Sequence, residues 1–332
     1  MTGIGEAVRA YLPGLALLAG GAVAATLVAD AVPGLQPLVV AVGIGVGLGN
    51  TVGIPEIAEP GVSADKLFLE TGIVLLGAAV AVEEFLAAGP TVLGLVVAVV
   101  AGGLLFAEVV ARGLFRIGSP TSSLLAAGAS ICGVSAVVAI GRVLDARGTA
   151  ITFAAATILL FDAATLVAFP LAGEWLGLTG RQFGVWAGVS MFSTGPVAAA
   201  GFAYSPEAGQ WATVTKLARN SLLGGVAVAY SLAYAARSAA DPGVRRLWAE
   251  FPKFLLGFLA VAAVANSGLL SPAALASIGR VSDALFALAF VGLGLSIRID
   301  DMRAVGAAPV GAVLVHLLVV SAVALAAVRW LL

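Results

Sequence analysis

The chain has 332 residues and a formal net charge of −1, and 61% of its residues are hydrophobic whereas only 11% are charged. A soluble domain carries about a quarter charged residues, so this composition excludes an ordinary soluble fold. The sequence contains no basic run and no nucleotide-binding loop, which argues against nucleic acid as a partner and against ATP as the energy source. The mean hydropathy of +1.10 favours an all-α polytopic membrane protein.

Cysteine and histidine are too scarce for most metal and disulfide chemistry. Cys132 is the only cysteine and His316 the only histidine, so the sequence excludes an intramolecular disulfide and His-based zinc motifs. An intramembrane enzyme would need a nucleophile paired with a base, or two aspartates within spans. Asp162 stands alone in its span, and we therefore expect no enzymatic activity, no cofactor and no metal.

Apolar stretches separated by short polar breaks predict about eleven transmembrane helices in one transporter unit over residues 1–332, with no separate soluble domain. The first stretch follows Arg9 and is long for a secretory signal, so we interpret it as an uncleaved membrane helix. The predicted spans are 12–31, 36–54, 67–84, 90–111, 120–141, 149–171, 183–203, 212–236, 252–270, 281–299 and 305–329.

Lysine and arginine placement gives an orientation. In the eleven-span topology these residues divide eleven against six between the two sides. Cytoplasmic loops carry the excess of positive charge. The sequence therefore predicts a multi-pass protein of the cell membrane with a cytoplasmic N-terminus and an external C-terminus. A homodimer is left open.

One internal likeness indicates an inverted repeat. Leu76-Gly77, followed by Glu83-Glu84, parallels Leu293-Gly294, followed by Asp300-Asp301, at a constant offset of 217 residues. The two predicted helices run in opposite directions, as in the inverted repeats of secondary transporters. Chance similarity between Gly-rich apolar helices is the alternative.

A second likeness has a shorter offset of 60 residues. It relates Ala127-Gly128-x-Ser130 to Ala187-Gly188-x-Ser190, and it extends to residues 137–141 and 197–201. In the eleven-span topology these two helices run parallel, so the likeness indicates shared packing of small residues rather than an inverted pair.

Two glycines and two serines between Gly128 and Ser135 weaken the fifth predicted span. A break within a bilayer is tolerated only where it lines a cavity or is buried in protein. A half-helix that begins near Gly133 would direct its N–H groups at an anion. Close packing of small residues is the alternative. The binding residues expected here are Ser130, Cys132, Gly133 and Ser135.

The seventh and tenth predicted spans contain similar signals. Pro196 removes a helix hydrogen bond in the seventh span, and the nearby hydroxyls either repair that break or face substrate. The tenth span is expected to be the second discontinuous helix, crossing the fifth. The binding residues expected from these spans are Ser190, Ser193, Thr194, Gly294 and Ser296.

Few charged residues lie within the spans. Lys216 and Arg219 share one helix face with Asn220 close by, a set that would hold a divalent oxyanion unless the two cations extend to the membrane interface. Asp162 lies near the centre of its span, where a carboxylate is costly and marks a functional site. We expect it to couple transport to protons, with pairing to a cation such as Arg219 as the alternative.

A series of motifs covers most of the chain from about residue 40 onward, and ICGVSA followed by KLARN is its most specific part. The motifs are Gly49-Asn50, GIVLLG from Gly72 to Gly77, ICGVSA from Ile131 to Ala136, WAGVS from Trp186 to Ser190, AAGF ending at Phe202, KLARN from Lys216 to Asn220, FPKF from Phe251, Gly257-Phe258, Asn266-Ser267 and Gly292-Leu293-Gly294-Leu295. With them the sequence resembles the YeiH-type family of bacterial and archaeal membrane proteins, which carries the label of sulfate exporters.

The resemblance implies a secondary transporter with a fold similar to bile-acid/sodium symporters, an inverted repeat and crossed, discontinuous helices. It implies a substrate such as sulfate, sulfite or an organosulfonate. After WAGVS the family continues with a histidine, an acid and a glutamine, and this chain has Phe192, Ser193 and Pro196 there. If the family histidine couples proton movement or contacts substrate, this chain does so differently or not at all.

These observations predict a secondary transporter that exports a small anion by alternating access within the lipid bilayer, with H⁺ or Na⁺ as the coupling ion. The alternative is a cation/proton antiporter in which Asp162 binds the ion. One buried acid without an acidic partner argues against that alternative. A receptor or scaffold would have no use for broken helices.

Overall fold

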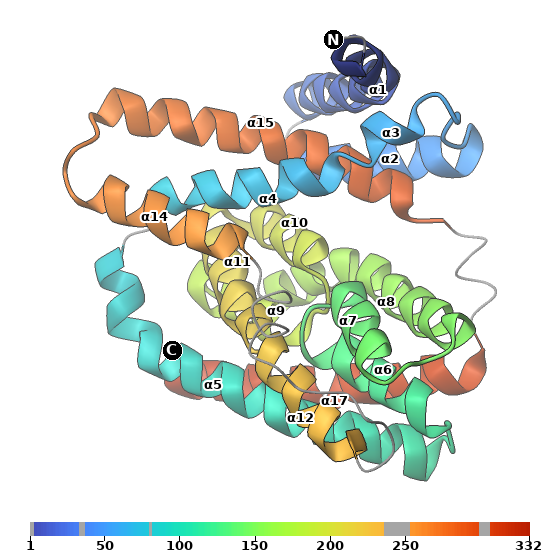
Figure 1. Cartoon of the computed structure of the whole chain (residues 1–332). Helices are drawn as coiled ribbons and strands as arrows, with labels where there is room; N and C mark the ends of the chain where they lie inside the picture. The colour runs from blue at the N-terminus through green and yellow to red at the C-terminus, as the bar shows by residue number, and fades with distance from the viewer. Residues whose placement is uncertain (1–2, 33–36, 80–81, 236–252, 299–305) are drawn as a thin grey trace. The chain divides into compact units, whose positions relative to one another are not determined.

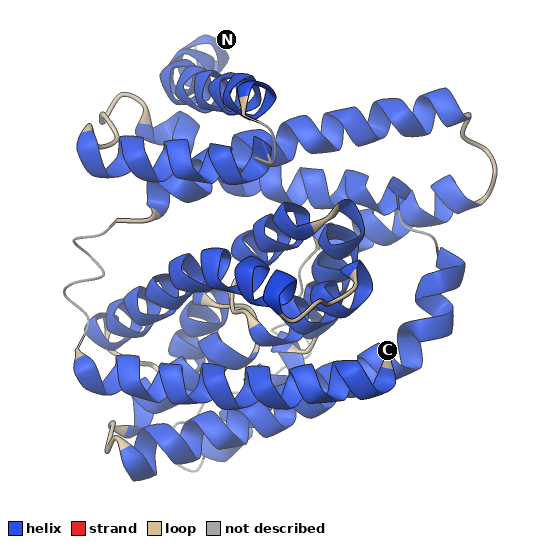
Figure 2. Cartoon of the chain, turned by 180° about the vertical axis from the view of Figure 1, so that it is seen from behind, coloured by secondary structure: helices blue, strands red, loops and turns tan. Residues whose placement is uncertain are grey.

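The computed structural model describes residues 3–32, 37–79, 82–235, 253–298 and 306–332, and every regular element in these ranges is a helix (Figures 1 and 2). Contacts divide the chain into two compact units. Unit 1 comprises Met1–Phe85 and Lys253–Ile299, and unit 2 comprises Leu86–Pro252 and Asp300–Leu332. The expected single transporter unit stays a prediction.

Unit 1 is a bundle in which α15 packs against α2 and α4. Its elements are α1 (Gly3–Ala31), α2 (Pro37–Thr51), α3 (Glu59–Val62), α4 (Asp65–Leu76), η1 (Gly77–Ala79), α14 (Phe254–Asn266) and α15 (Pro272–Ser296). Gly45 of α2 and Gly294 of α15 lie backbone to backbone, since a Cβ on either would overlap the main chain of the other helix. Small residues permit such close approach between membrane helices.

Unit 2 contains the ICGVSA and KLARN motifs, which are the most specific ones of the sequence. Its elements are α5 (Val82–Val109), the π-helical η2 (Val110–Leu114), α6 (Ser119–Ser130), α7 (Val134–Val143), α8 (Gly148–Trp175), α9 (Gly180–Ser190), α10 (Thr194–Tyr204), α11 (Pro206–Ser221), α12 (Leu223–Ala235) and α17 (Ala307–Leu331). The first residues of α5 belong to unit 1.

Five of the described helices are long and apolar enough to cross a membrane: Arg9–Ala31, Gly89–Leu114, Gly148–Trp175, Pro272–Ser296 and Ala307–Leu331. This confirms a helical membrane protein that crosses the bilayer several times. The count of eleven spans stays a prediction, and so does the inverted repeat between residues 76 and 293. Asp300-Asp301, which that repeat includes, lie outside the described residues.

The fifth predicted span is a helical hairpin. The break lies at Ile131-Cys132-Gly133, and α7 begins immediately after Gly133, as predicted. α7 then turns back along α6, because Gly141 lies against the side chain of Leu124. In a continuous helix these two residues would be about 25 Å apart. The green helices α6 and α7 run side by side in Figure 1. We call this element hairpin 1.

The seventh predicted span is a second hairpin, formed by α9 and α10. Its break lies at Met191-Phe192-Ser193. The rings of Phe183 in α9 and Tyr204 in α10 stack with centroids 4.1 Å apart, so the two ends of the element meet. Gly184 and Gly201 both pack on the same stretch of α11. We call this element hairpin 2.

The expected second discontinuity in the tenth span is wrong. α15 is one continuous helix from Pro272 to Ser296, and glycines at 292 and 294 serve close packing against Asp65 and α2. The second broken helix is the one in the seventh span. The break of hairpin 2 lies 60 residues after that of hairpin 1. The sequence likeness at an offset of 60 residues therefore relates the two hairpins to each other.

Candidate functional site

The two hairpins meet at their tips. We call Ser130–Gly133 tip 1 and Ser190–Ser193 tip 2. Gly133 has φ +68°, a backbone conformation that L-residues rarely adopt, and a Cβ there would overlap Ser193 Oγ. Only glycine permits this turn and this contact together, which explains the Gly133 of the ICGVSA motif.

Arg219 of α11 holds both tips. Its Nε donates to Ser130 O at 2.7 Å, its Nη2 donates to Ala129 O, and its Nη1 donates to Met191 O at 2.5 Å. The carbonyl groups at a helix C-terminus lack partners within the helix and carry the negative end of its dipole. Arg219 thus compensates the C-terminal ends of α6 and α9 at once.

Lys216 lies one turn earlier on the same face of α11 and has a similar role. Its Nζ donates to Ile131 O at 2.7 Å and to Met191 O at 3.2 Å. Lys216 is 0% exposed and Arg219 is 1% exposed. The two cations therefore do not extend to the membrane interface, and the alternative based on that idea is wrong.

Asp162 approaches tip 2 from the middle of α8. Its Oδ1 accepts from Ser193 N–H at 2.9 Å, next to the first residue of α10, whereas its Oδ2 has no hydrogen-bond partner. Asp162 interacts electrostatically with Lys216 and Arg219. Among the described residues, however, no ion pair within 4.0 Å joins it to either cation. Direct pairing with Arg219 is therefore not what holds Asp162.

Asn220 and His316 complete the surroundings of the tips. Asn220 Nδ2 donates to Thr194 Oγ1 at 3.0 Å in the first turn of α10. His316 of α17 lies near Phe106 of α5 and Phe192 of tip 2, with ring centroids 6.3 and 6.4 Å away. Its Nδ1 has no hydrogen-bond partner. Phe192 is the position where the family pattern has histidine, so an imidazole lies beside that position here, supplied by another helix.

Buried polar atoms without partners gather around the tips. A buried polar group normally has a hydrogen-bond partner, because leaving it unpaired costs about 1–3 kcal/mol. Six of the eight such atoms in the described part of the chain belong to this region. They are Ser130 Oγ, Asp162 Oδ2, Ser190 Oγ, Thr215 Oγ1, Asn220 Oδ1 and His316 Nδ1. This concentration makes the tips the candidate functional site.

The tips are reached from the N-terminal ends of α7 and α10. Ser135 is exposed, and Val134, Ser193 and Thr194 are partly exposed, whereas Ser130 and Ser190 lie deeper and are buried. Neither α7 nor α10 has a side-chain hydrogen bond at its N-terminal cap. Two N-termini without a side-chain cap therefore begin where the chain is accessible, and helix N-termini favour anions.

The structure brings most predicted site residues together. Residues from the fifth, seventh and eighth predicted spans meet at the tips with Asp162, and Cys132 lies close enough to Lys216 and Arg219 to interact electrostatically. Gly294 and Ser296 belong to unit 1 instead, where Ser296 Oγ donates to Leu293 O at 2.7 Å. The predicted set omitted Thr215 and His316. For His316, the signal was a lone histidine within an apolar span.

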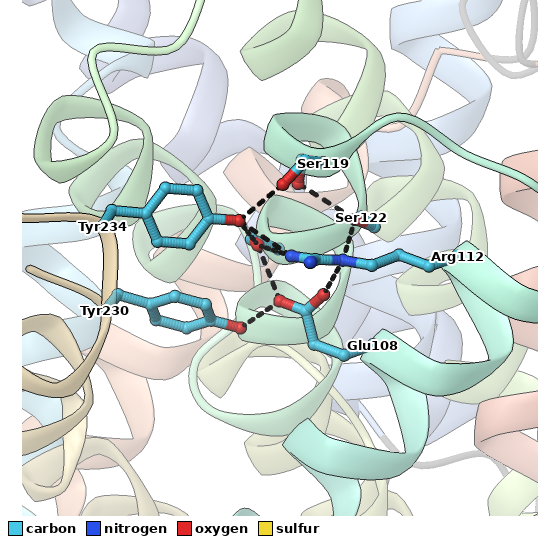
Figure 3. A network of polar contacts seen from close by, with 7 residues as sticks. Glu108, Arg112, Ser119, Ser122, Tyr230 and Tyr234 are labelled. Atoms are coloured by element: carbon cyan, nitrogen blue, oxygen red, sulfur yellow. Dashed lines mark hydrogen bonds and ion pairs between the residues drawn. The ribbon is translucent and has the colours of Figure 1, made fainter. Parts of the chain in front are cut away.

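A second polar cluster lies at the base of hairpin 1. Glu108 Oε2 and Arg112 Nε form an ion pair at 2.6 Å, and Ser123 Oγ and Tyr230 OH both donate to Glu108 Oε1. Arg112 Nη2 donates to Tyr234 OH at 2.8 Å. Figure 3 shows Ser119, Ser122, Tyr230 and Tyr234 gathered around the ion pair of Glu108 and Arg112. We call this set the base cluster. It joins α5, η2, α6 and α12.

Comparison with known proteins places the chain in a family. The family model described as "Conserved hypothetical protein 698" matches residues 13–313. No solved structure matches.

Three of the curated relatives match this chain over most of their own length. A UPF0324 membrane protein of Nitratidesulfovibrio vulgaris is 32% identical over 91% of this chain and 88% of its own length. One of Corynebacterium glutamicum is 33% identical over 90% of this chain and 86% of its own. The UPF0324 membrane protein TauZ of Paracoccus denitrificans is 30% identical over 92% of this chain and 91% of its own length. The chain therefore belongs to the UPF0324 family of membrane proteins, the YeiH-type family that its motifs resemble.

Proposed function

We propose that this protein is a secondary transporter that carries a small anion past the two hairpin tips by alternating access. The observation that carries the proposal is a charge imbalance. Lys216 and Arg219 are fully buried at the tips, and Asp162 is the one buried carboxylate close to them among the described residues. Burying an uncompensated charge is expensive, so this surplus of one positive charge favours an anionic ligand.

The hydrogen-bonding groups agree with an anion. Lys216 and Arg219 use most of their N–H groups on the tip carbonyls, so their charge attracts the ligand more than their hydrogen bonds do. Direct donors would be the hydroxyls of Ser130 and Ser190 and the first N–H groups of α7 and α10. This differs from the sequence-based expectation that both cations bind the oxyanion directly.

The lengths of the hairpins support re-entrant elements that meet near the middle of the bilayer. α6 and α9 have 12 and 11 residues. Each rises about 17–18 Å, roughly half of the distance that a transmembrane helix covers. The single helix α8, with 28 residues, runs between the two hairpins and has Asp162 at its middle. Hairpin 1 would thus enter from one face and hairpin 2 from the other, as in inverted repeats with a midplane site.

If each hairpin returns to the membrane face from which it entered, the division of lysine and arginine between the two sides also changes. The chain would then cross nine times, and lysine and arginine divide twelve against three instead of eleven against six, with Lys216 and Arg219 at the tips. This sharper asymmetry supports a cytoplasmic N-terminus. The twelve are Arg9, Lys66, Arg112, Arg116, Arg142, Arg147, Arg237, Arg245, Arg246, Lys253, Arg298 and Arg303, and the three are Arg181, Arg280 and Arg329.

A cation/proton antiporter is the second candidate. The observation that favours it is the pair of unpartnered oxygens, Asp162 Oδ2 and Asn220 Oδ1, near the start of α10. Oxygen atoms of this kind bind Na⁺ well. A cation there would add to the charge of Lys216 and Arg219, which interact electrostatically with Asp162. Electrostatics therefore favour the anion.

Sulfate, sulfite or an organosulfonate is the substrate class that the family resemblance implies, with export as the direction. Tetrahedral oxyanions suit a site built from hydroxyls and helix N-termini. We would measure uptake of radiolabelled sulfate and sulfite into proteoliposomes, in sodium and in potassium salts, with and without a pH gradient. Saturable flux of either anion supports the proposal. Proton flux that follows a sodium gradient without any anion supports the antiporter.

Cys132 gives an independent test of binding at the tips. It is the only cysteine of the chain, so a maleimide can report on tip 1 alone. Sulfate bound between the tips should slow alkylation of Cys132, whereas chloride at equal ionic strength should not. The Cys132→Ala variant controls for labelling elsewhere. Alkylation at the same rate with and without sulfate, in a protein that transports sulfate, would move the site away from tip 1.

A further inference from the structure

We propose that the hairpin-tip site accepts one net negative charge, so that a divalent anion enters together with a proton on Asp162 and a monovalent anion enters without one. The inference rests on the proposed function and specifies its substrate charge and its coupling. It follows from the charges of three side chains and from the hydrogen bonds that fix them.

The two positive charges are held in place by the fold. Arg219 donates to carbonyls of both tips, and Lys216 donates to Ile131 O and Met191 O. These carbonyls are the negative ends of α6 and α9, which stabilise the charged form of each side chain. Neither side chain can leave without exposing buried carbonyls, so the fold fixes both groups at the tips, and the proposal assigns each of them a positive charge.

The negative charge, in contrast, can be cancelled without breaking the structure. Asp162 Oδ1 accepts the Ser193 N–H, and Oδ2 has no partner. A proton that binds to Oδ2 leaves the bond from the Ser193 N–H to Oδ1 in place. It also converts that oxygen from an acceptor, which repels an anion, into an O–H donor, which can bind one.

The charge balance then has two neutral solutions. With Asp162 ionised, the three side chains sum to one positive charge, which a monovalent anion neutralises. With Asp162 protonated, they sum to two positive charges, which a divalent anion neutralises. A divalent anion beside ionised Asp162 would leave a surplus negative charge in a buried site, and this is the costly combination.

Other ionisable groups face the same region and need a control. Hairpin 1 contributes Cys132 and α17 contributes His316, while α11 contributes the two cations; the described residues of α6, α9 and α10 that face the tips are uncharged. His316 lies near Phe106 and Phe192 and interacts electrostatically with Arg219. His316→Gln therefore tests whether the imidazole rather than Asp162 carries the proton.

Sulfate and methanesulfonate form a matched pair of probes, because both are tetrahedral and both stay fully ionised between weakly acidic and neutral pH, with charges of −2 and −1. In proteoliposomes, sulfate flux should rise by about tenfold for each unit of acidification on the loading side while Asp162 is mostly ionised. Methanesulfonate flux should not rise under the same conditions.

Asp162→Asn is the decisive variant. The amide keeps an oxygen for the Ser193 N–H and places an N–H₂ donor where Oδ2 was, so it imitates the protonated acid. Sulfate flux should become independent of pH, and methanesulfonate flux should fall by about tenfold, because one positive charge stays uncompensated. Asp145→Asn is the matched control. Asp145 is an exposed loop residue with φ +48°, which asparagine tolerates, and this variant should behave as wild type.

The outcomes separate the inference from the function on which it rests. Equal acid stimulation of both anions, or acid stimulation of sulfate that survives in folded Asp162→Asn, overturns the inference and leaves anion transport intact. Acid stimulation that disappears in His316→Gln but not in Asp162→Asn also overturns it. If wild-type protein carries neither anion, the proposed function itself fails. Should Asp162→Asn not fold, the comparison of the two anions in wild type still decides.

Discussion

Two polar clusters of unit 2 share a hairpin and differ in how completely their atoms are paired. At the base of hairpin 1, serine and tyrosine hydroxyls bond to Glu108 Oε1 and to Arg112, and Glu108 Oε2 lacks a hydrogen bond but forms the ion pair with Arg112. At the tips, two cations bind backbone carbonyls and interact with a carboxylate that lies apart from them, and six buried side-chain atoms have no partner.

The difference separates polar groups that hold the fold from groups that, in our proposal, bind a ligand. A satisfied network in a membrane strengthens the contact between helices, and nothing in it is left to bind a solute. A site with unpaired buried groups costs stability, which a protein retains where function requires it. Arg219 belongs to both categories, because its bonds hold the tips while its charge serves the site.

The largest effect is expected from removing Arg219. Arg219→Met removes the donor to the buried carbonyl of Ser130 and leaves Met191 O with Lys216 alone, so the variant should lose about 3 kcal/mol or more of stability. That loss corresponds to a melting temperature about 10 °C lower. Arg112→Met is the matched comparison, because the Arg112 side chain is 43% exposed and water can replace part of its bonds.

Thermal unfolding in detergent, followed by size-exclusion profiles, measures both variants. Arg112→Met should lower the melting temperature by less than half as much and should keep sulfate transport. Equal losses in the two variants would contradict the distinction between the clusters, because the tip carbonyls would then be no more dependent on their cation than the base cluster is on Arg112.

The next effect concerns the contact between the tips. Gly133→Ala introduces a Cβ that overlaps Ser193 Oγ at a residue with φ +68°, so we expect a cost of about 1–3 kcal/mol and loss of transport. Gly102→Ala in α5 is the control, since no atom lies within 4 Å of its Cβ position and alanine favours helices. Sulfate flux and melting temperature measure the pair. Normal flux in folded Gly133→Ala would place transport elsewhere.

A crossed pair of serine variants separates stability from binding. Ser190→Ala removes a hydroxyl without a partner, so stability should stay unchanged while sulfate affinity falls about tenfold. Ser123→Ala removes bonds to Glu108 and Arg112, so stability should fall by about 1–3 kcal/mol while affinity stays unchanged. Melting temperature and protection of Cys132 from alkylation measure the two quantities. A variant that changes both equally would remove the distinction.

The sequence predicted much of the tip site because its signals are local. Glycine and serine at 128–135 located the break of hairpin 1, and the cost of a carboxylate in a membrane located Asp162. The same sequence misplaced the second break in the tenth span. There, Gly292 and Gly294 allow helix contact, and composition alone does not distinguish glycine at a break from glycine at a contact.

The hairpins themselves could not be predicted from hydropathy. An apolar stretch of about 20 residues looks the same whether it crosses the bilayer or turns back at its middle. The contacts that distinguish the two, Gly141 with Leu124 and Phe183 with Tyr204, join residues far apart in sequence. The likeness at an offset of 60 residues was visible in the sequence. We interpreted it as shared packing, because the assumption that every apolar stretch crosses the bilayer made the two helices run parallel. The carbonyl partners of Lys216 and Arg219 depend on those turns and were hidden for the same reason.

The smallest effect is expected at the edge of the base cluster. Tyr230→Phe removes one hydrogen bond, from Tyr230 OH to Glu108 Oε1 at 2.9 Å, while Ser123 and Arg112 still satisfy that carboxylate. We expect a loss of about 1 kcal/mol, with sulfate flux and its pH dependence unchanged. Thermal unfolding and flux at two pH values measure this. A change in pH dependence would mean that Glu108 takes part in proton movement, and the base cluster would then belong to the transport pathway rather than to the support of hairpin 1.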